Sequence, residues 1–472
     1  MPSRRAVMTG ALAAAIVPAA ERTQSPPAKD AGAGKTAPTV LRLQTQTIEV
    51  KGKPASVFAI RQPDGTAGIT TDIGKRFRVR VENKIGEPSL IHWHGLTPPW
   101  RQDGVPGISA PPIGPGGSAN YDFKLRFGGT FWMHSHQGLQ EQLLMAAPLI
   151  IHDDRDRPDQ QEIVVMLADF SFTPPQQIFD ELKKPKKMAG MAMGGSGTAM
   201  AAAPDLNDVK YDAFLANDRT LADPEIVKIE PGGKVLLRII NSSSMSAYHI
   251  DLGRLEGELI AVDGFQIAPI AGRVFPIAVA QRLDIRATVP PGPGAYPVLA
   301  VLEGERRQTG IVLAAGDAKI SRVSDMAGQA SPALTLELER RLRAAKPLAP
   351  RKADRVHTLD LTGDMAKYIW SINNVVWSKE VPPLPIAKGE RVELVLVNKT
   401  GMSHPMHLHG HEFQVVEIDG ARFSGAVRDT VLVPAGRRVA VAFDANNPGL
   451  WAFHCHLLYH LDAGMFTTFR YV

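Results

Sequence analysis

Short stretches of this chain alternate hydrophobic and polar residues, which predicts β-strands because successive side chains of a strand point to opposite faces. In residues 74–83, GKRFRVRVEN, the alternation directs Phe77, Val79 and Val81 toward a core and the arginines between them toward water. Gly, Pro, Asn and Asp separate such stretches along most of the chain, a pattern typical of turns between strands. The sequence therefore predicts an all-β protein.

This strand pattern occurs three times, as GKRFRVRVEN at 74–83, GGKVLLRIIN at 232–241 and GERVELVLVN at 389–398. In each copy a glycine lies nine residues before an asparagine. An internal repeat indicates repeated structural units, and a chain of 472 residues fits three domains of roughly 150 residues each. We therefore expect three related β-sandwich domains.

The three domains are expected to follow an N-terminal leader and to include one linker. The predicted ranges are 1–37 for the leader, 38–157 for the first domain, 158–318 for the second, 319–350 for the linker and 351–472 for the third. A charged stretch within the linker, 331–350, predicts a short helix.

The second domain carries an insertion, 183–204, that is rich in Gly, Ala and Lys and contains four methionines. Thioethers are soft ligands that favour Cu(I). The insertion is therefore interpreted either as a loop that collects cuprous ions or as a flexible loop with incidental methionines.

The N-terminus has the pattern of an export signal. Arg4 and Arg5 precede a run of small apolar residues that ends near Ala20, which indicates a twin-arginine signal. The run is too short to span a bilayer, so we expect an exported, periplasmic protein without a stable membrane anchor. The alternative is a tail with a chance pair of arginines.

Charge and composition narrow the range of partners. The net charge of +5 is scattered rather than gathered into a basic patch with aromatic residues, so we expect no nucleic-acid binding. The sequence leaves monomer or homo-oligomer undetermined.

Histidines gather into four groups that contain ten of the fourteen in the chain. The groups are His92 with His94, His134 with His136, His404 with His407 and His409, and His454 with His456 and His460. The other four, His152, His249, His357 and His411, are expected to be ordinary core or surface residues. Four H-x-H pairs beside a single cysteine indicate metal binding, because imidazole is the commonest metal ligand.

The repeat predicts where the pairs meet. In the first and third domains one pair begins nine residues after the asparagine of the repeat, and the other begins five residues after a later glycine. The equivalent positions of the second domain hold Ile250 and Leu252 and, counted from Gly294, Leu299 and Val301. Two equivalent sets of four histidines are therefore expected to meet where the first and third domains face each other.

Cys455 is the only cysteine, so it has no partner for an intrachain disulfide and suits a permanent thiolate ligand. Because side chains alternate along a strand, His454 and His456 point to one face and Cys455 to the other. Two imidazoles, a thiolate and a weak axial thioether are the ligands of a blue copper site, and Cys455, His460 and Met465 supply three of these four. One strand is therefore predicted to serve two sites.

The two sites suggest a division of labour. Eight imidazoles can hold three copper ions, two ions with three ligands each and one with two. Such a cluster can pass several electrons to dioxygen together, which avoids the release of superoxide or peroxide. The thiolate site would collect electrons singly and pass them through Cys455 to His454 and His456.

Four motifs resemble those of the multicopper oxidases: HWHG at 92–95, HSH at 134–136, HPMHLHG at 404–410 and HCHLLYHLDAGM at 454–465. That family includes laccases, cuprous oxidases, ferroxidases and the copper-resistance protein A group. The stretches HSHQGLQEQ and LTGDMAKYIWSINN are more similar to the last group than to fungal laccases. The resemblance implies three cupredoxin-like Greek-key β-sandwich or barrel domains.

The resemblance also implies four copper ions and their ligands. A type 1 copper would be held by His404, Cys455 and His460 with Met465 axial, and a type 2 copper by His92 and His407. The type 3 pair would use His94, His134 and His456 for one ion and His136, His409 and His454 for the other. The weak Met465 thioether would give a lower potential than a position with no ligand.

Further residues are implied to handle protons. Asp103 matches an acidic residue that helps deliver protons toward dioxygen, although an Asp before Gly104 is also typical of a turn. Leu461 stands where some bacterial members have a Glu, so we expect proton delivery through Asp462 or water.

The expected activity is one-electron oxidation of a reductant coupled to four-electron reduction of dioxygen to water. The reductant is interpreted as a phenol or aromatic amine, as in laccases, or as Cu(I). Met402 resembles a methionine that binds substrate copper in cuprous oxidases, but Thr400 stands where an Asp would help.

Two alternatives remain beside this activity. A copper nitrite reductase would lack the full set of eight histidines. A periplasmic copper-resistance protein that acts mainly as a cuprous oxidase, or that sequesters copper, is the other alternative.

Overall fold

The computed structural model describes residues 37–154, 159–184 and 206–472. The predicted export signal and nearly all of the methionine-bearing insertion lie outside the described residues, so both stay predictions. Pro38–Val472 forms one compact unit. In the described part of the chain no helix is long and apolar enough to cross a membrane.

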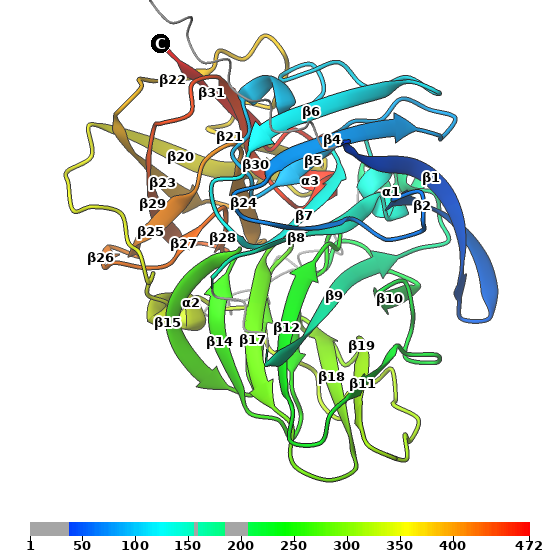
Figure 1. Cartoon of the computed structure of the whole chain (residues 1–472). Helices are drawn as coiled ribbons and strands as arrows, with labels where there is room; N and C mark the ends of the chain where they lie inside the picture. The colour runs from blue at the N-terminus through cyan, green and yellow to red at the C-terminus, as the bar shows by residue number, and fades with distance from the viewer. Residues whose placement is uncertain (1–36, 155–158, 185–205) are drawn as a thin grey trace, which may run out of the picture. The chain divides into compact units, whose positions relative to one another are not determined.

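The first domain has two four-stranded sheets (Figure 1). One has the order β2-β1-β4-β6, with β1 Thr39–Val50, β2 Lys53–Arg61, β4 Arg76–Asn83 and β6 Ser118–Lys124. The other has the order β3-β8-β7-β5, with β3 Ile69–Asp72, β5 Ile91–His94, β7 Gly129–Ser135 and β8 Ala146–His152. Two short 3-10 helices, η1 Trp100–Gln102 and η2 Gln140–Leu143, lie in the connections.

The second domain has a six-stranded and a five-stranded sheet. The first has the order β10-β9-β12-β17-β14-β15, with β9 Gln160–Phe170, β10 Ala213–Ala216, β12 Lys234–Asn241, β14 Gly257–Val262, β15 Phe265–Gly272 and β17 Arg282–Thr288. The second has the order β11-β19-β18-β13-β16, with β11 Ile226–Ile229, β13 Tyr248–Asp251, β16 Val274–Ile277, β18 Gly294–Leu302 and β19 Gln308–Ala315. Helix α1 spans Pro175–Leu182.

The third domain follows helix α2, Glu337–Arg341, which confirms the short helix expected in the linker. Its first sheet has the order β21-β20-β23-β29-β25-β26 with β27 beside β25, formed by β20 Arg355–Asp364, β21 Ile369–Ile372, β23 Arg391–Asn398, β25 Phe413–Ile418, β26 Ala421–Arg422, β27 Val427–Arg428 and β29 Arg438–Asp444. Its second has the order β22-β31-β30-β24-β28, formed by β22 Leu384–Ile386, β24 His404–Leu408, β28 Thr430–Val433, β30 Leu450–Cys455 and β31 Phe466–Tyr471. Helix α3 spans Leu458–Asp462.

The three domains repeat one topology. The repeat strands β4, β12 and β23 pair in parallel with β1, β9 and β20 and antiparallel with β6, β17 and β29. In the other sheets, β5-β7-β8-β3, β13-β18-β19-β11 and β24-β30-β31-β22 follow the same order and directions. The expected all-β fold built from an internal repeat is therefore confirmed.

Each asparagine of the repeat binds the backbone of the turn that follows it. Asn83, Asn241 and Asn398 are buried, and each accepts a hydrogen bond at Oδ1 from the backbone N–H two residues later. Each also donates from Nδ2 to a carbonyl four or five residues later. The side chain therefore satisfies the backbone of the turn that leads toward each metal-site strand.

Strand pairing corrects one predicted equivalence. His92 pairs with His134 and His407 with His454, but Ile250 pairs with Ala300 rather than with Leu299. Register is set by pairing and not by the distance from a preceding glycine. The second domain still has apolar residues at these positions, as expected.

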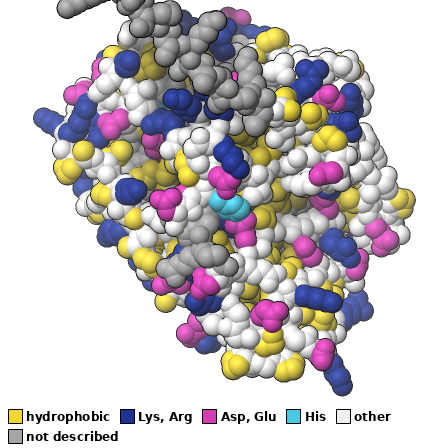
Figure 2. Space-filling view, viewed as in Figure 1, with side chains coloured by type: hydrophobic (Ala, Val, Ile, Leu, Met, Phe, Trp, Pro, Cys, Tyr) yellow, Lys and Arg dark blue, Asp and Glu magenta, His cyan; other side chains and the backbone are white. Residues whose placement is uncertain are grey.

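Charged side chains of both signs are interspersed over the face in Figure 2, with no large basic patch.

Buried ion pairs connect the domains. Arg428 contacts Asp263 and Glu339, and all three are buried. This cluster joins the third domain to the second domain and to helix α2.

Glu303 is a buried carboxylate at the end of β18, 5% exposed, and accepts a hydrogen bond from the Leu334 N–H at 2.6 Å. Burial raises its pKa to about 7, although the Leu334 amide opposes the shift. The native state therefore binds this proton more tightly than the unfolded state. The free energy of unfolding from this group decreases as the pH rises from about 4.5 to about 7.

The Glu303→Gln substitution removes this titration. We consider the free energy of unfolding of the variant minus that of the natural protein. This difference is expected to be more favourable to the variant at pH 8 than at pH 5, by up to about 3 kcal/mol. Thermal unfolding of both proteins at both pH values measures the difference, with Glu305→Gln as the matched control. An equal difference at the two pH values would contradict the prediction.

Candidate metal centre

The turn after β30 and the first residue of β24 bring together three of the ligands predicted for the thiolate site. Cys455 Sγ lies 3.6 Å from His404 Nδ1 and 3.9 Å from His460 Nδ1, and these two nitrogens are 3.3 Å apart. Met465 is buried in the same turn: its N–H donates to the His460 carbonyl, and its own carbonyl accepts from the Cys455 N–H. Helix α3 thus folds the chain back onto Cys455.

An oxygen atom contacts the Nε2 atom of each of these two imidazoles. Thr400 Oγ1 lies 2.7 Å from His404 Nε2, and Asp208 Oδ2 lies 2.9 Å from His460 Nε2. The Tyr368 hydroxyl donates to the same carboxylate oxygen at 2.7 Å. A histidine whose Nε2–H is bonded to an oxygen presents an unprotonated Nδ1 toward the thiol.

The donors of this site are chemically suited to a soft cation. Burial raises the pKa of the Cys455 thiol, and burial together with His460 lowers the pKa of His404 well below its usual range. The site therefore holds a neutral thiol and neutral imidazole rather than an ion pair. A soft metal ion that displaces the thiol proton stabilises the thiolate.

On the opposite face of β30, His92 and His407 form a pair. Their Nε2 atoms lie 3.4 Å apart, and their Nδ1 atoms contact the carbonyls of Asp103 at 2.9 Å and Asp429 at 2.8 Å. A carbonyl can only accept, so each Nδ1 carries the hydrogen and each Nε2 presents a lone pair. Two lone pairs at this distance repel unless a cation lies between them.

A second group contains His136, His409 and His454. His454 Nε2 lies 2.9 Å from His409 Nε2 and 3.3 Å from His136 Nε2. The Nδ1 atoms of His409 and His454 are held by Asp103 Oδ2 and the Cys455 carbonyl, each at 2.9 Å. Their Nε2 atoms are thereby turned toward one another.

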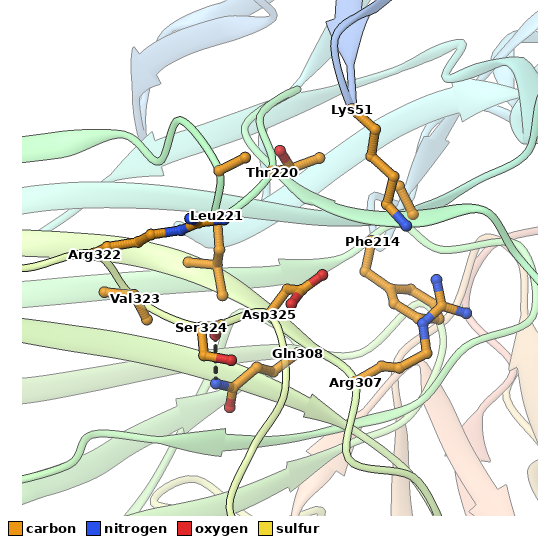
Figure 3. A pocket seen from close by; sticks show the side chains of 12 residues that line it. Lys51, Phe214, Thr220, Leu221, Arg307, Gln308, Arg322, Val323, Ser324 and Asp325 are labelled. Atoms are coloured by element: carbon orange, nitrogen blue, oxygen red, sulfur yellow. Dashed lines mark hydrogen bonds between the residues drawn. The ribbon is translucent and has the colours of Figure 1, made fainter.

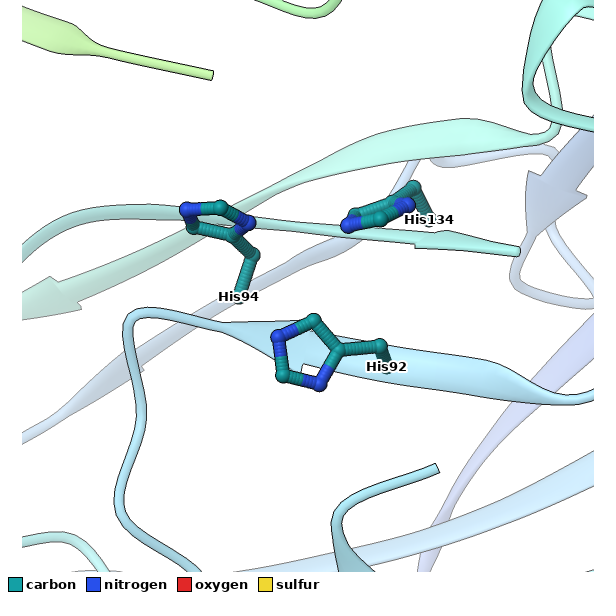
Figure 4. A group of neighbouring side chains, drawn as sticks. All are labelled: His92, His94 and His134. Carbon is teal, nitrogen blue, oxygen red and sulfur yellow. The ribbon is translucent and has the colours of Figure 1, made fainter. Parts of the chain in front are cut away.

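A third group contains His94, His134 and His456, and Figure 4 shows two of its rings beside that of His92. One nitrogen of each ring, His94 Nδ1, His134 Nε2 and His456 Nε2, is buried and has no hydrogen-bond partner among the described residues. The remaining nitrogens of two rings are held by carboxylates, His94 Nε2 by Asp429 at 3.0 Å and His134 Nδ1 by Glu141 at 2.8 Å. Unpartnered buried donors or acceptors are costly, so this arrangement fits a metal ion.

Asp103 is both the predicted turn residue and a neighbour of the histidines. It follows η1 and is only 2% exposed. Its Oδ2 contacts His409 Nδ1, while Oδ1 lies 3.3 Å from His92 Nδ1.

Asp462 and Leu461 line a cavity of about 90 Å³ together with His136, His454 and His456.

The second domain contributes a positioning group through Arg282. This fully buried guanidinium binds both carboxylate oxygens of Asp429 and also donates to the carbonyls of Thr130 and Asp263. Burial opposes ionisation of Asp429, but Arg282 and His94 lower its pKa well below the usual range. The charged Asp429 then orients His94 and His407.

Three carboxylates of this centre were missed by sequence reasoning: Asp208, Glu141 and Asp429. Glu141 lies in η2, seven residues after His134, within the quoted stretch HSHQGLQEQ, but its contact with His134 was not predicted. Asp208 and Asp429 are distant in sequence from the histidines that they contact, and nothing local marks them.

A surface pocket away from the clustered histidines is a different site (Figure 3). It measures about 270 Å³ and is lined by Lys51, Arg307, Arg322 and Asp325 among others. None of the predicted copper ligands lines it, so its size does not bear on the metal centre.

Comparisons with known proteins show the family of the chain. Models of multicopper oxidase domains match residues 42–156, 161–315 and 350–472. The chain is 31% identical to Multicopper oxidase MmcO of Mycobacterium tuberculosis over 93% of this chain and 88% of the relative. It is 28% identical to a Copper resistance protein A homolog of Pseudomonas syringae over 84% and 86%.

Solved structures show the same fold. The multicopper oxidase Fet3p, which functions in iron import, has a TM-score of 0.78 at 20% identity over 92% of this chain and 90% of its own. A mutant laccase from B. aclada has a TM-score of 0.77 at 22% identity over 91% and 86%. Three matching domain models and a relative above 30% identity establish that this chain belongs to the multicopper oxidases, a family of copper-dependent oxidoreductases.

Proposed function

We propose that this enzyme oxidises a reductant one electron at a time at the Cys455 site and reduces dioxygen to water at the eight-histidine site. The observation that carries the proposal is the strand His454-Cys455-His456. Cys455 contacts His404 and His460 on one face, while its two neighbours join the other histidines on the opposite face. The path between the sites is therefore one residue of covalent chain.

The proposed ligands are those given by the motifs. They are His404, Cys455, His460 and Met465 for type 1; His92 and His407 for type 2; and His94, His134, His456, His136, His409 and His454 for the type 3 pair. Copper bound there would supply one-electron chemistry at the first site and multi-electron reduction of dioxygen at the second. The close groups of ring nitrogens support this assignment.

The chain's own carboxylates act on the histidines. Asp103 holds His409 and is positioned to carry protons to the space between the rings. Asp462 lines the 90 Å³ cavity together with His136, His454 and His456. Asp208 holds His460 so that its Nδ1 faces Cys455. These groups fix tautomers and ring orientation before any ion arrives.

The reductant is proposed to be a phenol or aromatic amine, Cu(I), or both. Relatives named Copper resistance protein A support the cuprous alternative, and relatives named laccase support the phenolic one. A periplasmic copper-resistance role, as a cuprous oxidase or as a copper-sequestering protein, is the second candidate. Periplasmic export, the four-ion content and the predicted domain boundaries belong to the same proposal.

Oxygen uptake tests the proposed function directly. Copper-loaded protein is expected to consume oxygen with Cu(I), with 2,6-dimethoxyphenol, or with both, whereas Cys455→Ser consumes none because its hydroxyl does not replace the thiolate. No oxygen uptake with either reductant, despite full copper occupancy, would exclude an oxidase and leave sequestration.

Asp103→Asn keeps the shape of the side chain but removes its ability to carry a proton. We expect kcat to fall by about a hundredfold, while anaerobic reduction of the type 1 copper by substrate keeps its rate. Stopped-flow absorbance separates the two steps, with exposed Asp64→Asn as control. A loss confined to type 1 reduction would contradict this role.

Asp208→Asn keeps an acceptor for His460 Nε2–H but removes the negative charge. The reduction potential of the type 1 copper is expected to rise, since a nearby carboxylate stabilises the oxidised ion, and kcat/KM is expected to fall about tenfold. Redox titration and steady-state kinetics measure both, with Asp223→Asn as the exposed control. An unaltered potential would show that Asp208 does not act on this site.

A further inference from the structure

The surface pocket of about 270 Å³ in Figure 3 lies where the first domain, the second domain and the segment after β19 meet. Lys51 reaches it from the turn between β1 and β2, and Arg307 from the turn before β19. Arg322 and Asp325 line it from the segment that follows β19. Its volume is close to the lower end of the range for small-molecule sites, about 300 Å³.

The charged side chains of this pocket are not paired with one another. Among the described residues, none of Lys51, Arg307 and Arg322 makes an ion pair, and Asp325 makes none either. These four are the charged residues that line the pocket, so it carries a net charge of +2. An anion of two negative charges would compensate this charge.

The guanidinium of Arg307 is held in place before any ligand arrives. Its Nη1 donates to the Tyr211 carbonyl at 2.7 Å and its Nη2 to the Asp212 carbonyl at 3.1 Å. It also lies 4.4 Å from the centre of the ring of Phe214, which is buried. Neutral carbonyls hold the guanidinium without cancelling its charge, and further N–H donors remain for a ligand. A side chain that is already fixed loses less conformational entropy on binding.

The segment that carries Arg322 and Asp325 is also held, because it binds the backbone and side chain of Gln308. The Gln308 N–H donates to the Asp325 carbonyl at 2.9 Å, and Gln308 Nε2 donates to the Ser324 carbonyl at 2.8 Å, the bond drawn in Figure 3. In the same view Arg322 lies apart from the other two basic side chains. The positive charges are therefore distributed along the pocket and not gathered at one point.

We propose that this pocket binds a small organic dicarboxylate, such as succinate. One carboxylate meets the Arg307 guanidinium, whose planar set of N–H donors matches a carboxylate, and Lys51 adds a positive charge. The second carboxylate meets Arg322. Asp325 opposes a third negative charge, a monocarboxylate compensates only one of the two charges, and a compact anion such as phosphate does not reach both groups of cations.

Isothermal titration of the copper-loaded protein with succinate, acetate and phosphate at constant ionic strength tests the proposal. We expect succinate to bind at one site at least about tenfold more tightly than the other two anions. Arg322→Gln and Lys51→Asn are each expected to weaken succinate binding about tenfold, because each removes a charge-assisted hydrogen bond. Lys51 has a φ of 52°, a conformation that asparagine tolerates. Lys228→Gln removes an exposed charge of β11 outside the pocket, so this control is expected to bind as the natural protein does.

Thermal unfolding provides the second readout. Succinate is expected to raise the Tm of the natural protein and of Lys228→Gln, since it binds the folded state, and to raise that of Arg322→Gln much less. The Tm without succinate reports that each variant is folded. No binding of succinate, equal affinity for phosphate or acetate, or equal succinate affinity in Arg322→Gln and the natural protein would overturn the inference. The pocket is separate from the metal centre, so this result does not depend on oxygen uptake.

Discussion

Side chains alternate along a β-strand, and in β30 this alternation places a thiol on one face and two imidazoles on the other. Cys455 and its neighbours therefore belong to two sites that share one segment of backbone. Any shift of this strand by one residue exchanges the two faces and destroys both sites together. Pairing of β30 with β24 and β31 fixes the register, and the turn through α3 returns His460 and Met465 to the Cys455 side.

The second constraint is electrostatic. Neutral rings with their lone pairs turned toward one another, and a buried thiol, form an arrangement that the protein alone does not stabilise. Oxygens of Thr400, Asp208, Asp103, Asp429 and Glu141 nevertheless impose these orientations. The rest of the fold therefore holds the centre in an arrangement that is unfavourable in free energy without a metal ion, and a bound cation offsets this free energy.

Local patterns predicted much of this molecule. The repeat predicted three equivalent strands because Asn83, Asn241 and Asn398 cap equivalent turns. The H-x-H spacing predicted that the two histidines of a pair lie on the same face, because the alternation of side chains along a strand is a local property. Register was predicted less well: Ala300, not Leu299, faces Ile250 because cross-strand pairing depends on two segments at once. Asp208 and Arg282 were not predictable, since their partners lie hundreds of residues away or in another domain.

The second domain holds none of the proposed copper ligands and still contributes to the centre. Its apolar residues, Ile250 and Ala300, occupy the positions of histidines, which removes the metal site but keeps the sandwich core. In exchange it contributes charged groups aimed at its neighbours: Arg282 at Asp429, and Asp208 at His460. Some of the groups that orient the proposed ligands thus come from a domain that holds none of these ligands. Substitutions in the second domain are therefore able to change the surroundings of His460 and Asp429 without altering any proposed copper ligand.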